Sequence, residues 1–212
     1  MWVDYREGCN GVPRTTATPT ILYIHGGFHV ACTTLTYRGL LCKLSRQSDC
    51  PIFAPRYRKA PENPFPLALE DILAAFMQLL EDPQVDPNNI IIAGDSSGAG
   101  MAVALRMILK DAGLPGPAGM LLWYPYLDMT LSLPSVKGNG RWDSNIDYAD
   151  FLPNDSTRDL ALYTGDHYYV RDKALLSHPY VSPLMADSFG DMGPTLVVSG
   201  IEVREAPRER VT

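Results

Sequence analysis

Residues 89–100, which read NIIIAGDSSGAG, decide the fold. Residues 89–93 predict a strand, and the continuous apolar run that follows Asn89 is typical of a strand whose sheet is covered on both faces. Residues 96–110 are rich in Ala, Met and Leu and predict a helix. Residues 94–98 match the pattern Gly-x-Ser-x-Gly at the junction between this strand and this helix. The sequence therefore predicts a sharp strand–turn–helix junction with Ser96 at its centre.

The glycines around Ser96 have a steric reason. A serine displayed on such a turn tolerates close neighbours only if they are glycines, because a Cβ atom would clash. The start of the helix directs backbone N–H groups and a positive partial charge toward an oxygen near Ser96. The pattern indicates a nucleophilic serine, with the N–H of Ser97 as a hydrogen-bond donor. The alternative is a glycine-rich turn that only packs the helix on the strand.

The rest of the chain alternates apolar runs with helical spacing, which favours an α/β fold with a mostly parallel sheet. The spacing of apolar residues predicts helices over residues 36–48 and 66–81. Apolar runs predict four more strands, at residues 20–24, 51–54, 119–124 and 195–199. Residues 129–180 are rich in Asp, Asn, Pro and aromatic residues, and we expect an insertion with short helices over one end of the sheet. A separate domain there is the second interpretation.

Bulk properties narrow the class of protein. A chain of 212 residues suits one domain, and a net charge of −6 argues against a nucleic-acid partner. The sequence contains no apolar run of the roughly 20 residues that span a membrane and does not begin with a secretory signal, so we expect a cytoplasmic protein. The four cysteines predict free thiols, with a single bridge involving Cys9 as the alternative.

A second candidate element, His25-Gly26-Gly27-Phe28, directly follows the strand predicted at residues 20–24. Two consecutive glycines let a loop fold so that their N–H groups converge on an anion. Such donors stabilise the negative charge of a tetrahedral intermediate, each by about 3 kcal/mol. We expect His25 to shape this loop and not to act as a base; a loop histidine that bonds only to local backbone is the simpler alternative.

Four motifs in this order carry a family resemblance. They are HGGF at residues 25–28, YRKAPENPFP at 57–66, GDSSGAG at 94–100 and SPL at 182–184. The sequence resembles the hormone-sensitive-lipase-like group of α/β-hydrolases from about residue 20 to residue 205. The resemblance implies the α/β-hydrolase fold and a serine esterase that acts on small acyl esters, without a cofactor or a metal.

The resemblance also implies roles for particular residues. Ser96 would be the nucleophile, and the backbone N–H groups of Gly26, Gly27 and Ser97 would form the oxyanion hole. Glu202 stands where the family places its triad acid, after the last predicted strand, although a solvated loop carboxylate is the alternative. Weaker contenders for the acid are Glu205 and Asp191.

Two further regions are interpreted through the same resemblance. Residues 57–66 would brace the oxyanion loop, and residues 129–180 would form part of a lid. Aromatic residues of this lid either line a substrate pocket or pin the segment to the core: Trp142, Tyr148, Phe151, Tyr163, Tyr168 and Tyr169. The neighbouring carboxylates Glu70 and Asp71 point about 100° apart on a helix, so we interpret them as a solvated helix face and not as an acid–base pair.

The sequence departs from the family pattern in its histidines. The family order is serine, acid, histidine, whereas all four histidines here precede Glu202. His178 is the nearest, and we do not expect it to replace the missing base. We therefore expect these residues to be an esterase domain incomplete at both ends, nearly inactive, with residues 195–199 as an exposed apolar edge. The alternative is a non-catalytic protein that binds a small ligand on the same fold.

Overall fold

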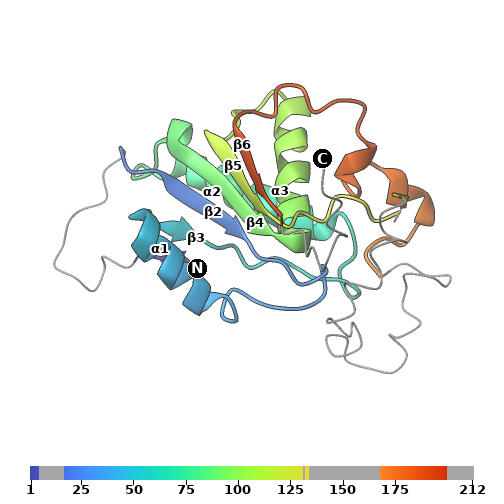
Figure 1. Ribbon diagram of the computed structural model, residues 1–212, viewed down its shortest axis with the longest axis horizontal. Coiled ribbons are helices and arrows are strands. Elements are labelled where there is room, and N and C mark those ends of the chain that lie inside the picture. The colour runs from blue at the N-terminus through green and yellow to red at the C-terminus, as the bar shows by residue number, and fades with distance from the viewer. Residues whose placement is uncertain (5–16, 131, 134–167, 200–212) are drawn as a thin grey trace, which may run out of the picture.

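A computed structural model of the protein describes residues 1–4, 17–130, 132–133 and 168–199. One sheet runs through it in the strand order β1-β3-β2-β4-β5-β6 (Figure 1). The strands are β1 (Trp2–Val3), β2 (Thr20–Ile24), β3 (Ile52–Phe53), β4 (Ile90–Asp95), β5 (Gly119–Trp123) and β6 (Thr195–Val198). The main helices are α1 (Arg38–Ser48), α2 (Leu67–Glu81) and α3 (Ser96–Asp111).

The sheet is parallel except at one edge. β3, β2, β4, β5 and β6 pair in parallel, while β1 pairs antiparallel with β3. The mostly parallel α/β fold predicted from the alternation of apolar runs and helices is therefore confirmed. The sequence did not predict β1, because a two-residue strand carries no periodicity.

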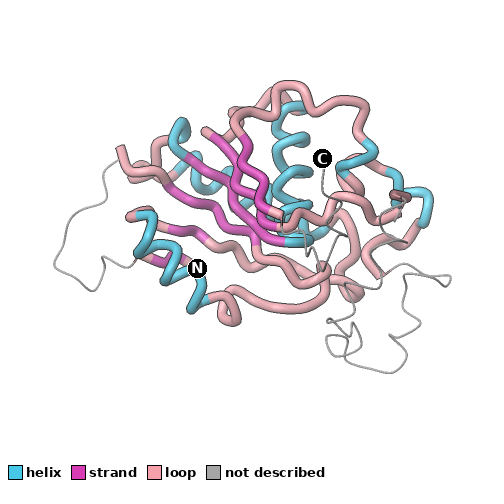
Figure 2. Tube along the Cα trace, in the orientation of Figure 1, coloured by secondary structure: helices cyan, strands magenta, loops and turns pink. Residues whose placement is uncertain are grey.

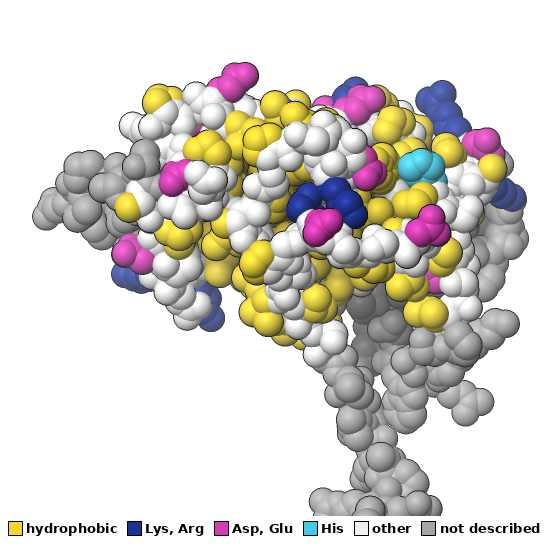
Figure 3. All heavy atoms as spheres, turned by 90° about the horizontal axis from the view of Figure 1, so that it is seen from above, with side chains coloured by type: hydrophobic (Ala, Val, Ile, Leu, Met, Phe, Trp, Pro, Cys, Tyr) yellow, Lys and Arg dark blue, Asp and Glu magenta, His cyan; other side chains and the backbone are white. Residues whose placement is uncertain are grey.

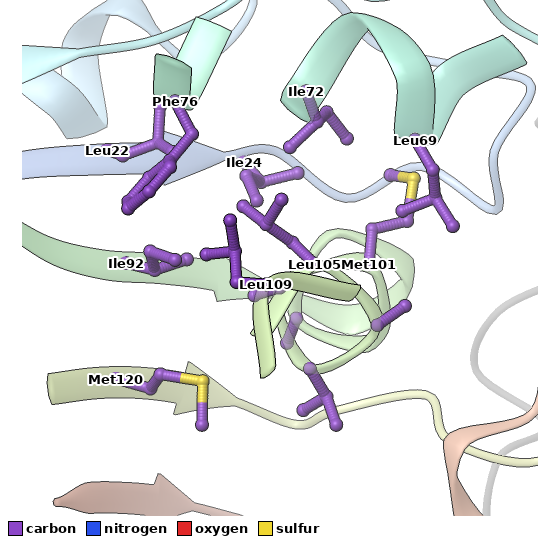
Figure 4. Close-up of a cluster of buried hydrophobic side chains, with 14 of the residues drawn as sticks. Leu22, Ile24, Leu69, Ile72, Phe76, Ile92, Met101, Leu105, Leu109 and Met120 are labelled. Carbon is purple, nitrogen blue, oxygen red and sulfur yellow. The ribbon is translucent and has the colours of Figure 1, made fainter. Parts of the chain in front are cut away.

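Both faces of the sheet are covered at β4, which explains the unbroken apolar run in this strand. Ile90 and Ile92 pack with residues of α2 and α3 on one face. Figure 4 shows Ile92 in this cluster. Ile91 and Ala93 belong to the cluster on the opposite face, which α1 covers. A parallel strand between two helical layers needs apolar side chains at every position, not at alternate ones.

The strand register places the loops that matter at one edge. Asp95 of β4 pairs with Trp123 of β5, which pairs with Val198 of β6. The carboxyl ends of β2, β4, β5 and β6 consequently lie along the same edge of the sheet, as the strand arrows of Figure 1 show. Figure 2 shows the loops and helices that continue from the strands. Ligands of open α/β sheets bind outside this edge.

The predicted elements agree with the structure apart from their ends. The first helix begins at Arg38, two residues later than predicted, because residues 33–36 form a turn held by Thr33 and Thr36. Of the predicted insertion, residues 129, 130, 132, 133 and 168–180 are described, and they include one short 3₁₀ helix, Lys173–Ser177. A second 3₁₀ helix, Pro183–Met185, follows in the SPL motif.

β6 forms an exposed apolar edge. Within the described part of the chain it pairs with β5 alone, and Leu196, Val197 and Val198 are 60%, 53% and 38% exposed. This agrees with the exposed edge expected for residues 195–199.

Figure 3 shows the face seen from above the view of Figure 1. On this face acidic and basic side chains lie side by side among hydrophobic ones, and neither sign of charge forms a patch.

Candidate active site

Ser96 occupies a strained turn between β4 and α3. It directly follows the last residue of β4, is the first residue of α3, and has φ of 50°. A positive φ is unfavourable for a serine and persists only where the surroundings enforce it. Tyr126 N–H donates to the Ser96 carbonyl oxygen at 3.0 Å, which helps hold the turn. The side chain of Ser96 is half-buried at the carboxyl edge of the sheet.

The glycines of the motif are required by close backbone packing. A Cβ on Gly98 would lie 2.5 Å from the His25 carbonyl oxygen, and one on Gly94 would lie 2.7 Å from the Ile24 carbonyl oxygen. Both distances are far inside van der Waals contact. β2 and its following loop therefore approach the turn so closely that only glycine fits at these positions.

The loop after β2 touches the serine itself. A Cβ on Gly26 would lie 3.1 Å from Ser96 Cβ, so the backbone at Gly26 packs directly on the Ser96 side chain. The next residue, Gly27, has φ of 120°, and its carbonyl oxygen accepts from Val30 N–H and Ala31 N–H at 3.0 and 2.8 Å. The structure thus places Gly26 against Ser96, with Gly27 next along the loop and Ser97 next along α3, and the three as oxyanion donors stay a prediction.

Asp95 holds one end of this loop. Its carboxylate accepts from Tyr23 OH at 3.0 Å, from Tyr37 OH at 2.7 Å and from Gly26 N–H at 3.0 Å. Burial, reinforced by the Asp95 carboxylate, raises the pKa of both phenols, so they stay protonated donors. Because the Gly26 N–H already bonds to Asp95, its role as an oxyanion donor stays a prediction.

The side chain of His25 is built into the loop. It is buried, its Nδ1 lies 2.7 Å from the Gly26 carbonyl oxygen, and its ring stacks on Tyr57 with centroids 4.5 Å apart. Tyr57 OH donates to the His25 carbonyl oxygen at 2.7 Å. Burial lowers the pKa of His25, which favours the neutral imidazole. These contacts agree with the interpretation that His25 shapes the loop.

Residues 57–66 brace the same loop, as the sequence predicted. Besides the Tyr57 contact, Ala60 N–H donates to the His29 carbonyl oxygen at 3.0 Å, and Lys59 Nζ donates to the Cys32 carbonyl oxygen. The interpretation of the carboxylates in α2 needs a correction. Arg58 binds Asp71 through two nitrogens at 2.8 to 3.1 Å and reaches Glu70 at 3.3 Å, so they anchor the brace to α2 and are not merely solvated.

The candidate acids fall in two places. Asp191 precedes β6, at the amino end of that strand, where Arg106 donates to its carbonyl oxygen. This is the edge opposite Ser96, so Asp191 is excluded as the acid. Glu202 and Glu205 lie outside the described residues, and the role of Glu202 stays a prediction.

The contacts of His178 support the interpretation that it is not the base. Its Nδ1 accepts from Tyr180 N–H at 3.1 Å, and its ring packs on that of Tyr180. Tyr180 OH donates to Asp111 at the last residue of α3, whereas Ser96 is the first. His167 lies outside the described residues.

Two of the six aromatic residues of the predicted lid, Tyr168 and Tyr169, lie within the described residues. Tyr169 is fully buried, stacks on His29 with centroids 3.8 Å apart, and accepts from Phe65 N–H at 2.7 Å through its carbonyl oxygen. For Tyr169, pinning to the core is therefore the better interpretation. Tyr168 is half-buried. Four lie outside the described residues: Trp142, Tyr148, Phe151 and Tyr163.

Sequence reasoning missed two tyrosines of the site. Tyr23 comes from β2 and Tyr37 from the residue before α1, and both hydroxyls donate to the Asp95 carboxylate. Tyr23 had a detectable signal, since a tyrosine inside a buried strand needs a partner for its hydroxyl. Cys32, Cys42 and Cys50 are free thiols, as predicted, and Cys9 lies outside the described residues.

The residues that the structure describes contain no group of three or more His, Cys, Asp or Glu side chains arranged to hold a metal ion. None of their helices is long and apolar enough to cross a membrane.

Comparison with known proteins places the chain in a family. A family model described as the alpha/beta hydrolase fold matches residues 21–203. An esterase from Acinetobacter venetianus is 34% identical over 187 residues, covering 88% of this chain and 57% of the relative. An acetyl-hydrolase from Streptomyces hygroscopicus is 33% identical over 187 residues, covering 86% and 56%. The chain thus spans a little over half the length of the curated relatives it matches.

Solved structures of esterases support the same family assignment. An esterase from the bacterial hormone-sensitive lipase family superposes with a TM-score of 0.72 at 33% identity, covering 88% of this chain and 58% of that one. An esterase/lipase from an uncultured bacterium superposes with a TM-score of 0.69 at 32% identity, covering 87% and 57%. The family match, the identities and the superpositions together show that this chain belongs to the α/β-hydrolase fold family, in its hormone-sensitive-lipase-like group.

Proposed function

We propose that these residues carry the nucleophile and the oxyanion loop of a serine carboxylester hydrolase that acts on small acyl esters. The observation that carries the proposal is the φ of 50° at Ser96 on the strand–helix junction, with the loop after β2 packed against its side chain. The names of the relatives, esterase and acetyl-hydrolase, support the same chemistry.

In the proposed mechanism, Ser96 Oγ attacks the carbonyl carbon of the ester and loses its proton to a base. The carbonyl oxygen becomes an oxyanion, and N–H groups of Gly27 and Ser97, with Gly26 if its bond to Asp95 is shared, stabilise that charge. The intermediate collapses, expels the alcohol and leaves an acyl group on Ser96. Water then attacks the acyl carbonyl, and the free acid departs.

The sheet register supports Glu202 as the acid. Val198, the last residue of β6, lies in the same row as Asp95, which precedes Ser96. β6 is two strands away from β4, a separation of about 10 Å. Four extended residues reach about 13 Å, so a chain leaving β6 at Val198 can bring Glu202 to the edge that carries Ser96.

We do not assign the base to any of the three histidines that the structure describes. His25, His29 and His178 each make specific contacts that fix their rings in loops, at a tyrosine in every case. We therefore propose that a polypeptide of these 212 residues hydrolyses esters very slowly. The same observation favours the second candidate function, binding of a small ligand without hydrolysis.

We predict that Ser96→Ala abolishes whatever acyl transfer the polypeptide performs. Incubation with p-nitrophenyl butyrate, followed by mass spectrometry, should find a butyryl group on the peptide containing Ser96. Release of p-nitrophenol should be lower by orders of magnitude than for a complete triad, because the oxyanion hole and substrate binding alone leave a residual rate about 10³-fold above that in water.

Ser45→Ala is the control, since it removes the hydroxyl of another serine, one that is buried in α1. Acylation that persists in Ser96→Ala contradicts the assigned nucleophile. Rapid turnover that depends on Ser96 contradicts the expected low activity. Saturable binding of the ester with no acylation supports the second candidate.

A further inference from the structure

The inference concerns Ser97, the residue after the proposed nucleophile, and it rests on the proposed function. The side chain of Ser97 is completely buried, and its hydroxyl oxygen accepts from His29 N–H at 3.3 Å. His29 lies three residues beyond Gly26, on the other side of the turn that contains Gly27. In the proposed mechanism Ser97 contributes only its backbone N–H, so its hydroxyl has no assigned role.

The two residues that flank Ser96 hold the two sides of the same loop. Asp95 accepts the N–H of Gly26 at 3.0 Å, and Ser97 accepts the N–H of His29. Gly27 and Phe28 lie between these two points, with φ of 120° and 55°. The position of this strained turn relative to Ser96 is thus fixed by side chains that emerge from the nucleophile's own neighbours.

His29 is itself held from the opposite side. Its carbonyl oxygen accepts from Ala60 N–H at 3.0 Å, and its ring stacks on Tyr169 with centroids 3.8 Å apart. His29 also has φ of 66°, a conformation that histidine adopts more readily than most residues. The bond to Ser97 therefore joins a well-anchored loop residue to the first turn of α3.

We propose that Ser97 is a positioning residue whose hydroxyl, by accepting the His29 N–H, sets the distance between the oxyanion donors and Ser96. The stack of His29 on Tyr169 supports this bond from the other side. A donor displaced by a fraction of an ångström loses much of its effect on a developing charge, so the hydroxyl acts on the tetrahedral state and not on the overall fold.

A probe that forms the tetrahedral state without turnover tests this in the 212-residue chain. Butylboronic acid is trigonal; Ser96 Oγ adds to its boron, the serine proton passes to solvent, and the adduct becomes tetrahedral and negatively charged. Its affinity, measured by boron-11 NMR titration, reports on the oxyanion site. Ser96→Ala must abolish this binding, or else the proposed function fails and the inference with it.

If Ser96-dependent binding is present, Ser97→Ala should weaken it about tenfold, since misplacement by up to 1 Å costs up to about a hundredfold. Ser45→Ala, which also removes a buried hydroxyl, one that donates to the Cys50 carbonyl oxygen, should leave it unchanged. His29→Ala should weaken binding similarly, and His29→Phe, which keeps a ring on Tyr169, should restore it. An affinity in Ser97→Ala equal to that in Ser45→Ala overturns the inference and leaves the proposed function intact.

Amide hydrogen exchange supplies the second readout. The His29 N–H should exchange faster in Ser97→Ala, while the Gly26 N–H, which Asp95 holds, should stay protected. Unchanged exchange at His29 contradicts the proposed hydrogen bond whatever the boronate result.

Discussion

At the scale of single residues, the site depends on glycines, because a Cβ atom would not fit at two positions beside Ser96. Gly94 and Gly98 let β2 and its loop approach the first turn of α3 to within contact of backbone on backbone. A side chain at either position has no flexible neighbour to displace, because the obstructing atoms are main-chain carbonyls. The strain at Ser96 persists because these contacts leave the turn no other path.

We predict that Gly98→Ala lowers the free energy of unfolding by about 3 kcal/mol, the upper end of the cost of overpacking. The added Cβ would meet the carbonyl oxygens of Ile24 and His25. Urea denaturation followed by circular dichroism measures the change. Gly39→Ala is the control: Gly39 is exposed in α1 with open space around its Cβ, so alanine should stabilise the helix by about 0.5 to 1 kcal/mol. A loss no greater than about 1 kcal/mol in Gly98→Ala would show that the backbone can yield.

At the scale of elements, the connection after β5 is organised by one buried carboxylate. Asp128 is 7% exposed and accepts from the N–H and hydroxyl groups of Thr130 and Ser132. Burial alone would raise the pKa of Asp128, but these hydrogen bonds outweigh it and lower the pKa below its usual 3.8. The ionised form is thus the one that the folded chain prefers.

This preference predicts a pH dependence. Because the folded pKa lies below the unfolded one, the contribution of Asp128 is complete above about pH 4 and is lost as the pH falls through the folded value. Asp128→Asn should therefore lower the stability by about 1 kcal/mol at pH 6 and by less at pH 3. Urea midpoints at both pH values check this. If the free energy of unfolding of Asp128→Asn differs from that of the unchanged chain by the same amount at pH 6 and pH 3, ionisation of Asp128 is not the cause of the difference.

The sequence predicted most elements because their signals are local. The buried run of β4, the spacing of α2 and the glycines around Ser96 each follow from contacts within a few residues. It could not predict that Asp71 binds Arg58, or that Tyr37 reaches Asp95, because those pairs are 13 and 58 residues apart. Such partners depend on how the elements pack, which periodicity does not describe.

At the scale of the whole molecule, the sheet has one vulnerable edge. Leu196 and Val197 of β6 are more than half exposed, and edge strands of this kind pair with other chains. The opposite edge is blunted, since β1 there is only two residues long. Self-association of the 212-residue polypeptide should therefore proceed through β6.

We predict that Leu196→Lys reduces concentration-dependent association of the polypeptide in sedimentation velocity experiments, because a charge on an edge strand opposes strand pairing. Leu40→Lys is the control, since Leu40 is 50% exposed on α1. The free energy of unfolding should change by less than about 0.5 kcal/mol in both variants. Equal association of the two variants would place the contact elsewhere.

β4 lies at the centre of the sheet, hydrogen-bonded to β2 on one side and to β5 on the other. Local opening of a protein begins where few contacts hold the chain and reaches such a central strand last. Ser96 extends directly from β4, whereas the loop of residues 25–32 lies outside the sheet and takes no part in its strand pairing. The two parts of the proposed site should therefore differ in local stability. As the temperature rises, the loop that carries Gly26 and Gly27 should begin to open while Ser96 still holds its position.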